Sequence, residues 1–164
     1  TNGGSVRYFI SHELSKFKSK KEIINKFLRE EKNNRLENPS AFKIFFNKIN
    51  KQKMKLNSLI KRLKESNKVI HGYGASTKGN VLLQYFGIKN NDLDYIAERN
   101  PKKYNLYTPG TRIKIISEKL SRQKKPNYYL VLPWHFKKEI LLRENNMRAK
   151  GTKFIFPLPT IKIY

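Results

Sequence analysis

Residues 69–80 read Val69-Ile70-His71-Gly72-Tyr73-Gly74-Ala75-Ser76-Thr77-Lys78-Gly79-Asn80, an apolar run that enters a glycine-rich turn. The amphipathic segment 81–86 follows at once. This order predicts a strand, a tight turn and the start of a helix, which together present backbone N–H groups to a phosphate. Gly72 and Gly74 permit the turn and the close approach of a ligand. The stretch therefore predicts a nucleotide-binding domain.

The side chains of this turn also suit a diphosphate. Ser76 and Thr77 supply hydroxyl groups, and Lys78 supplies a positive charge at the expected N-terminus of the helix. The alternative is that a hydroxyl only caps the helix while the lysine is solvated. The predicted substrate-binding residues of the turn are Gly72, Gly74, Ala75, Ser76, Thr77 and Lys78.

The turn matches the dinucleotide-binding fingerprint in part. Its first two glycines fit G-x-G, but Thr77 stands at the sixth position and Gly79 comes two residues later. Glu98 lies near the end of the next predicted strand, where an acid can hold a ribose hydroxyl. The spacing of a Walker-type loop is absent. A stand-alone NAD(P)- or nucleotide-binding Rossmann domain, or a tight turn with no ligand, therefore stays open as an alternative.

The rest of the chain alternates between segments with the apolar spacing of helices and segments with the apolar spacing of strands. Asn38-Pro39-Ser40 is a typical helix start, because Asn can cap and Pro tolerates the first turn. Strands alternating with helices predict an α/β fold, a Rossmann-like three-layer sandwich with a mostly parallel sheet and helices on both faces. The expected helices are Lys20–Glu31, Ala41–Ser66, the segment after the glycine turn, and Phe136–Asn146. The expected strands are Val6–His12, Val69–His71, Leu93–Ala97, Ile113–Ile116, Asn127–Leu132, Phe154–Phe156 and Ile161–Ile163.

Polar and aromatic residues follow several of these strands. Ligands of open α/β sheets bind at the carboxyl ends of the strands, so these positions are candidates for substrate contacts. The alternatives are an ion pair within the loop, a plain tight turn at 107–110, and a structural histidine. His71, inside a predicted strand, is expected to be structural. The candidates are Glu98, Arg99, Asn100, Tyr107, Thr108, Trp134 and His135.

Length and composition narrow the class of protein. A chain of 164 residues can form one domain with a core. It has no run of about 18 apolar residues and no secretory signal, so we expect no membrane partner and a cytoplasmic location. With no cysteine, it has no disulfide, zinc–thiolate site or cysteine nucleophile, and we expect it to hold no metal.

The formal net charge of +24, from 36 basic and 12 acidic residues, suggests a polyanionic partner. However, abundant Lys, Asn and Ile are typical of an A+T-rich genome, and the basic residues are scattered along the chain. A nucleic-acid-binding protein more often gathers Arg and aromatic residues on one face. We therefore keep a basic nucleic-acid-binding module as an alternative and do not expect nucleic acid as the main partner.

Several stretches, taken together, resemble the C-terminal domain of sugar C-methyltransferases that depend on S-adenosylmethionine (SAM). The resemblance covers essentially the whole chain, and the combination is more specific than any single stretch. The stretches are Asn2–Arg7, Gly72–Asn80, Glu98–Tyr104, Tyr107–Thr111, Leu132–Phe136 and Phe154–Pro159.

The resemblance implies an enzyme of three parts: a zinc-binding domain, a SAM-binding domain and a Rossmann-like C-terminal domain. Such enzymes methylate a carbon beside the keto group of a nucleotide-linked deoxy sugar. Residues 1–37 would then form a strand and helix at the junction to the SAM-binding domain, and residues 38–164 the Rossmann-like domain. The sequence lacks the cysteine-rich zinc segment, the acidic glycine-rich SAM motif and the His-Glu-His segment of that family.

This chain is therefore expected to bind the sugar nucleotide and close the active site without methylating anything alone. SAM and zinc would be bound by the absent domains, and the expected partners are the sugar nucleotide and the SAM-binding domain. No catalytic residue is expected here beyond support from His135. The first residue is Thr1, so we expect a fragment or a processed chain.

Overall fold

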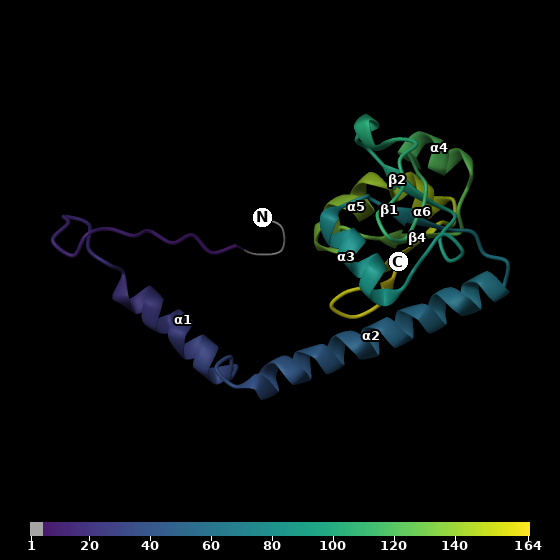
Figure 1. Ribbon diagram of the computed structural model, residues 1–164. Coiled ribbons are helices and arrows are strands. Elements are labelled where there is room, and N and C mark those ends of the chain that lie inside the picture. The colour runs from purple at the N-terminus through teal and green to yellow at the C-terminus, as the bar shows by residue number, and fades with distance from the viewer. Residues whose placement is uncertain (1–4) are drawn as a thin grey trace. The chain divides into compact units, whose positions relative to one another are not determined.

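The computed structural model describes residues 5–164 (Figure 1). The stretch Asn2–Gly4, which contributes to the family resemblance, lies outside the described residues. The chain divides into two compact units, residues 1–50 and residues 51–164. The division falls within helix α2 (Pro39–Glu65), whereas the sequence placed a domain boundary after residue 37, which stays a prediction.

The second unit is built on one six-stranded sheet with the order β3-β2-β1-β4-β5-β6. All neighbouring strands are parallel except β6, which pairs antiparallel with β5. The order reverses between β1 and β4, so that ligands of such sheets bind at the carboxyl ends of these two strands. The strands are β1 (Ile70–Tyr73), β2 (Tyr95–Glu98), β3 (Ile115–Ser117), β4 (Tyr128–Val131), β5 (Lys153–Phe156) and β6 (Lys162–Ile163).

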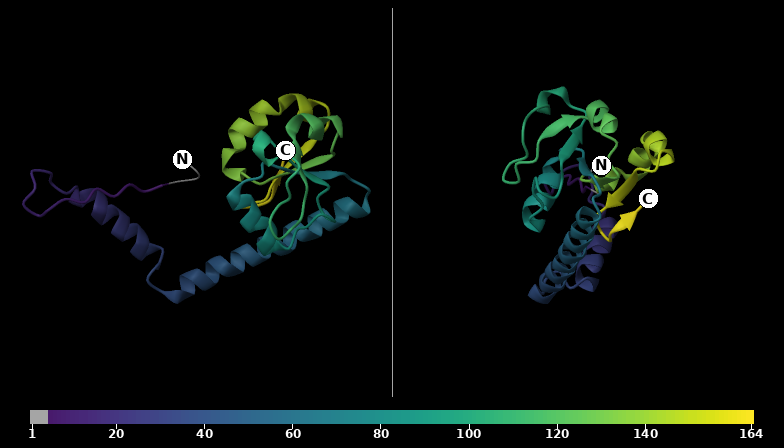
Figure 2. Two further views of the ribbon diagram at one scale, coloured as in Figure 1. Left: turned by 45° about the horizontal axis from the view of Figure 1, so that its top comes forward. Right: turned by 90° about the vertical axis from the view of Figure 1, so that its right-hand side faces the viewer.

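Helices cover both faces of this sheet (Figure 2). On one face lies α3 (Thr77–Phe86) with the second half of α2, where Leu56 is fully buried and the Asn57 side chain donates to the Phe86 carbonyl at 2.9 Å. On the other face lie α4 (Glu118–Gln123), α5 (Lys137–Arg143) and α6 (Asn145–Ala149). The expected Rossmann-like three-layer sandwich is confirmed.

Alternation along β1 divides its side chains between the two faces. His71 and Tyr73 point toward α4 and α5, where His71 Nδ1 lies 2.8 Å from Ser121 Oγ. The Tyr73 hydroxyl donates to Glu144 at 2.8 Å. His71 is buried, as expected for a structural histidine, and burial lowers its pKa to about 4 against an opposing effect of Asp94. It is therefore neutral at neutral pH.

Glu144 explains an error in the helix prediction. One helix was expected over Phe136–Asn146, but α5 ends at Arg143 and α6 begins at Asn145. Glu144, only 1% exposed, lies between them and accepts hydrogen bonds from the side chains of Tyr73 and Arg122. A buried carboxylate needs such partners, and this long-range pairing is invisible to helical periodicity. Helix α4, which supplies Arg122, was not predicted, because only six residues form it.

The first unit contains α1 (Lys21–Asn33) and the beginning of α2. The expected helix over Lys20–Glu31 is confirmed, and so is the helix start at Pro39, where Asn38 Oδ1 accepts from the Ser40 N–H at 2.9 Å. The expected strand over Val6–His12 was wrong, since residues 5–12 have no regular secondary structure. Their side chains are exposed, and a strand needs a neighbouring strand for its backbone hydrogen bonds.

Within residues 5–164, no helix combines the length and the apolar character that crossing a lipid bilayer requires.

Candidate functional site

The candidate site lies at the carboxyl ends of β1, β2 and β4, on either side of the point where the strand order reverses. The glycine turn follows β1, the segment Glu98–Asn100 follows β2, and Trp134 and His135 follow β4. The fold therefore brings together three of the four segments that the sequence singled out.

The glycines of the turn serve close packing inside the protein. Gly74 has a φ of +81°, and a Cβ there would lie 2.9 Å from the ring of Pro133. A Cβ on Gly79 would lie 2.6 Å from Leu132 Cβ, so this glycine lets α3 approach β4. Gly79 thus has the helix-packing role of the third fingerprint glycine, two residues later than the fingerprint places it.

Most backbone donors of the turn are already used within the protein. The Gly74 N–H donates to the Ala97 carbonyl, and the Ser76 N–H donates to the Gly74 carbonyl, both at 2.8 Å. The Ala75 N–H donates to Glu98 Oε2 at 2.7 Å. Gly72 lies within β1, paired with β2 and β4. The N–H groups of Gly74, Ala75 and Ser76 therefore all have partners within the protein.

Glu98 holds the turn in place. Its carboxylate accepts the N–H groups of Ala75, Arg99 and Asn100 at 2.7, 2.9 and 2.9 Å. Lys103 Nζ donates to the Ala75 carbonyl at 2.8 Å and fixes the same residue from its other side. Hydrogen bonds to an ionised carboxylate are stronger than those between neutral groups. Glu98 is thus a structural clamp of the turn, with little acceptor capacity left for a ribose hydroxyl.

The N-terminus of α3 presents the predicted diphosphate side chains. Ser76 caps the helix, because its Oγ accepts the Gly79 N–H at 3.0 Å. Thr77 and Lys78 are exposed in the first turn. The helix dipole and the ammonium group both favour an anion at this position.

His135 lies across the reversal point from this helix end. Burial lowers the pKa of its imidazole, and the positive charge of Lys78 lowers it further. The ring is therefore neutral at neutral pH. Its Nδ1 is buried and has no hydrogen-bond partner in the described chain. Because Nδ1 is buried, a neutral imidazole beside a lysine can bind a hydroxyl or a phosphate oxygen only through its other ring nitrogen.

Rings on either side support His135. Trp134 packs edge-on to it with ring centres 6.0 Å apart, and the Phe136 ring centre lies 4.3 Å away. Trp134 also packs against the core cluster that includes Tyr73. These contacts fix the orientation of the imidazole.

Comparison with known proteins shows the family of this chain. The sequence model of the family described as C-methyltransferase C-terminal domain matches residues 1–159. The C-methyltransferase NovU of Streptomyces niveus is 26% identical over 167 residues, which cover 99% of this chain and 38% of NovU. This chain belongs to the C-methyltransferase C-terminal domain family. It spans well under half the length of the curated relative that it matches.

In this C-methyltransferase C-terminal domain, the loop with Tyr107 and Thr108 is not brought to the glycine turn by any described contact. Thr108 is 2% exposed, and its Oγ1 contacts Thr111 Oγ1 at 2.6 Å and accepts the Ile113 N–H at 2.9 Å. The tip of the loop is tied to the far part of α3, where Gln84 donates to the Pro109 carbonyl at 3.0 Å. Thr108 therefore stabilises a turn, while Tyr107 is exposed.

Arg99 and Asn100 lie at the end of β2 with exposed side chains. Asn100 Oδ1 caps the short 3₁₀ helix Pro101–Lys103 by accepting the Lys102 N–H at 3.1 Å. Arg99 is the exposed cationic residue of this segment. Sequence reasoning missed the roles of Lys103 and Pro133, because their contacts join segments far apart in the chain.

The residues of this C-methyltransferase C-terminal domain do not fit the two cofactors that the resemblance implies. Zinc needs His, Cys or carboxylate ligands in a group, and no such group occurs among residues 5–164. SAM carries a ribose, but the carboxylate that follows β2, Glu98, is held by three backbone N–H groups.

Proposed function

We propose that this domain binds a nucleotide-linked keto-deoxy sugar and presents it to SAM, the methyl donor, which is bound elsewhere in the enzyme. The observation that carries the proposal is the pairing of Lys78, at the N-terminus of α3, with neutral His135 across the strand-order reversal. In this arrangement the diphosphate lies at the first turn of α3, contacted by Ser76, Thr77 and Lys78. The sugar extends toward Trp134 and His135.

The chemistry of the reaction explains this division of labour. Methylation of a carbon beside a ketone needs a base, stabilisation of the enolate and alignment of the carbon with the methyl group. The nucleotide diphosphate is a remote handle, and its binding energy can position the reacting carbon. His135 hydrogen-bonds the sugar and holds its orientation, while the base and the methyl group come from outside this domain.

The test is a calorimetric titration of the domain with thymidine diphosphate at physiological salt, where weak surface attraction is screened. We expect saturable binding at one site. The single variants Thr77→Ala and Lys78→Ala should each weaken it by about tenfold, as expected for the loss of a charge-assisted hydrogen bond.

Lys89→Ala is the matched control, because it removes the same charge beyond the other end of α3. It should bind like the unaltered chain. Equal weakening by Lys89→Ala and Lys78→Ala would show attraction to the general positive charge and contradict the placement of the diphosphate. Methyl transfer by this chain alone, with SAM and a keto sugar nucleotide, would contradict the division of labour.

One observation favours a second candidate. The strand order β3-β2-β1-β4-β5-β6 is that of dinucleotide-binding sheets. NADH added in the same titration separates the two: binding tighter than that of thymidine diphosphate would favour a dinucleotide site. The held carboxylate of Glu98 and the Thr77 position lead us to expect the opposite result.

A further inference from the structure

The Rossmann-like unit has a hollow at the edge of the sheet opposite to the candidate site. Its volume is about 920 Å³, within the range of about 300–1,000 Å³ that is usual for small-molecule sites. Residues 126–127 and 151–152 line the hollow and directly precede β4 and β5, whereas the candidate site follows the carboxyl ends of the strands. Helices α4 and α6 supply further lining residues. We call this hollow the amino-end pocket.

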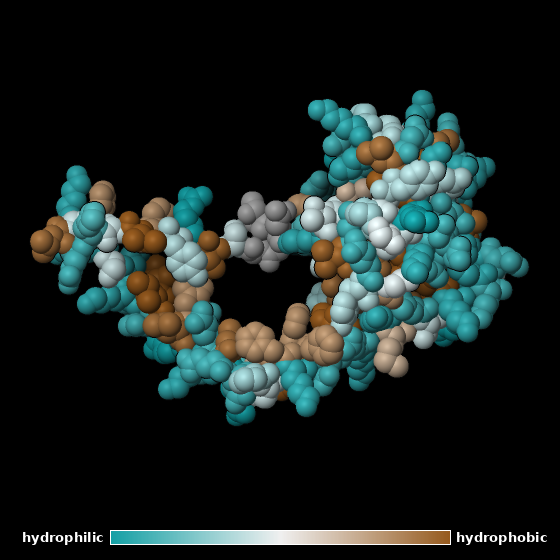
Figure 3. Space-filling view, viewed as in Figure 1, coloured by the Kyte–Doolittle hydropathy of each residue, from teal (hydrophilic) through white to brown (hydrophobic). Residues whose placement is uncertain are grey.

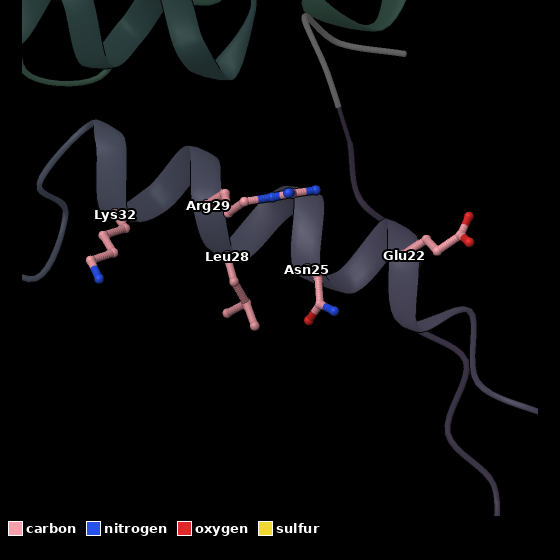
Figure 4. Close-up of a pocket in the computed structure, with 5 residues that line it drawn as sticks. All are labelled: Glu22, Asn25, Leu28, Arg29 and Lys32. Atoms are coloured by element: carbon pink, nitrogen blue, oxygen red, sulfur yellow. The ribbon is translucent and has the colours of Figure 1, made fainter.

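The construction of the amino-end pocket distinguishes it from other polar surface. Hydrophilic side chains cover most of the second unit on the side seen in Figure 3, so charge alone marks no site. A smaller hollow, of about 450 Å³, lies along α1, and Figure 4 shows that all five of its lining side chains come from that one helix. One helix cannot surround a ligand. The amino-end pocket, by contrast, is lined from α4, α6 and the two segments that lead into β4 and β5.

The lining of the amino-end pocket is cationic. Five of its side chains are cationic and one, Glu144, is anionic. Glu144 and Glu118 pair with the two arginines of the pocket. Among the described residues no carboxylate pairs with its three lysines, which are exposed. Like charges around one cavity repel each other unless an anion lies among them. The cations are Lys119, Arg122, Lys125, Arg143 and Lys150.

Arg122 is already held in place for an anion. Its Nε donates to Glu144 Oε2 at 3.1 Å, and its Nη2 donates to Glu118 Oε2 at 2.8 Å. No described residue accepts a hydrogen bond from Nη1, and 35% of the side chain is exposed. A guanidinium group presents its donors in a rigid fork that suits phosphate oxygens. Because two carboxylates fix Arg122 during folding, an anion that meets Nη1 has little side-chain entropy to remove there.

The lining favours a small phosphorylated molecule over a nucleic-acid strand. Proteins that bind single strands stack the bases on aromatic side chains. None of the described residues that line the amino-end pocket is aromatic. Lysines from three separate segments need several negative charges to neutralise them, and a chain of phosphate groups supplies these charges in one small ligand.

We propose that the amino-end pocket is a second anion site, which binds a triphosphate group. Arg122 contacts the phosphate chain through Nη1, while Lys119, Lys125 and Lys150 neutralise its charge. The pocket and Lys78 lie at opposite edges of the sheet, so this site is separate from the proposed sugar-nucleotide site and does not depend on it.

Calorimetry with inorganic triphosphate at physiological salt tests the proposal. We expect saturable binding, weakened about threefold by Lys119→Gln or Lys150→Gln and about tenfold by the double variant, as for the loss of exposed charge pairs. Lys89→Gln/Lys162→Gln is the matched control, because it removes the same charge from exposed residues outside the pocket. It should bind like the unaltered chain. Equal weakening in the two double variants would reveal general attraction to positive charge and overturn the proposal.

Nuclear magnetic resonance locates the ligand on the same chain. Inorganic triphosphate should shift the side-chain Nε–H signal of Arg122 together with the backbone signals of residues 125, 127 and 150–152. Shifts confined to residues 76–80 would place the ligand at the N-terminus of α3 and overturn the proposal. The mutational test uses the exposed lysines rather than Arg122, because Arg122 also holds buried Glu144.

Three further ligands identify what the amino-end pocket recognises. Equal or weaker binding of ATP assigns the pocket to the phosphate chain alone, and tighter binding assigns it to a nucleoside triphosphate. Single-stranded oligothymidylate that binds more tightly than triphosphate, with a steep salt dependence, would assign the surface to nucleic acid and overturn the proposal. Thymidine diphosphate should bind Lys119→Gln/Lys150→Gln as it binds the unaltered chain. Equal weakening of both ligands in this variant would mean one shared site, which also overturns the proposal.

Discussion

Helix α2 carries one apolar stripe along its 27 residues, but its two halves differ in what covers that stripe. In the second half Leu56 and Ile60 are buried in the Rossmann-like unit, whereas Phe42 and Phe45 in the first half are exposed. Periodicity is the same in both halves. Apolar periodicity predicts that one face of the helix is buried, but it does not identify what packs against that face.

The largest expected effect comes from shortening one apolar side chain in each half of α2. Leu56→Ala removes a fully buried side chain and should lower the free energy of unfolding by about 2–5 kcal/mol. Phe45→Ala should change it by less than about 0.5 kcal/mol in the chain alone, because its side chain is exposed. Urea denaturation of both variants measures the difference. A comparable loss in Phe45→Ala would mean that the first half is also covered.

The second test concerns acid sensitivity, which we expect to originate in the buried unit. Burial lowers the pKa of His71 from 6.5 to about 4. In the unfolded chain His71 takes up a proton near pH 6.5, whereas in the folded chain it does not. The contribution of neutral His71 to the free energy of unfolding is therefore fully present above pH 6.5. It should be lost as the pH falls from 6.5 toward 4, by about 3 kcal/mol in total.

Urea midpoints between pH 7 and pH 4 measure this loss. His71→Gln should flatten the curve, since it removes the titrating group. His135→Gln is the comparison variant and should flatten the curve less, because burial is the main cause of the lowered pKa in both residues and His135 is less buried than His71. A slope that is unchanged in His71→Gln would contradict the assignment.

The third test concerns close packing, which the second unit has and the first half of α2 lacks. Gly79→Ala would place a Cβ 2.6 Å from Leu132 Cβ and force α3 away from β4. Overpacking of this kind should cost about 1–3 kcal/mol. Val81→Ala, two positions further along the same helix and exposed, should cost less than about 0.5 kcal/mol. Thermal denaturation of the two variants side by side is the measurement.

The smallest expected effect compares two helix caps. Ser76→Ala removes the hydroxyl that accepts the Gly79 N–H and should cost about 1 kcal/mol. Asn38→Ala removes the corresponding cap of α2, where Asn38 Oδ1 accepts the Ser40 N–H. That end of α2 can fray without opening the core, so the global unfolding free energy should hardly change. Equal losses would show that the first unit unfolds together with the second.

The sequence predicted the sheet and its helices well where the signal is local. The glycine turn, the Asn38-Pro39 helix start and the apolar strands were all recognisable from a few neighbouring residues. The errors arose where a distant partner decides. The strand over Val6–His12 lacked a neighbouring strand, and buried Glu144 interrupted a helix because Tyr73 and Arg122 bind it.

The same division holds for the candidate site. The sequence located the segments that follow β1, β2 and β4, because ligand-binding residues of such sheets follow strands. It could not distinguish a group that faces a ligand from one that faces the protein. Glu98 and Thr108 have the chemistry of ligand contacts, but their oxygen atoms are occupied by backbone N–H groups.

The hold of Glu98 on the glycine turn has a consequence for the thermodynamics of ligand capture. Three hydrogen bonds from one carboxylate, with Lys103 on the Ala75 carbonyl, immobilise the turn during folding. The loss of backbone entropy therefore falls on folding, and a ligand that arrives later meets a turn already in shape. For the proposed diphosphate site at the end of α3, this means that weak contacts can suffice for capture, with a modest entropic penalty.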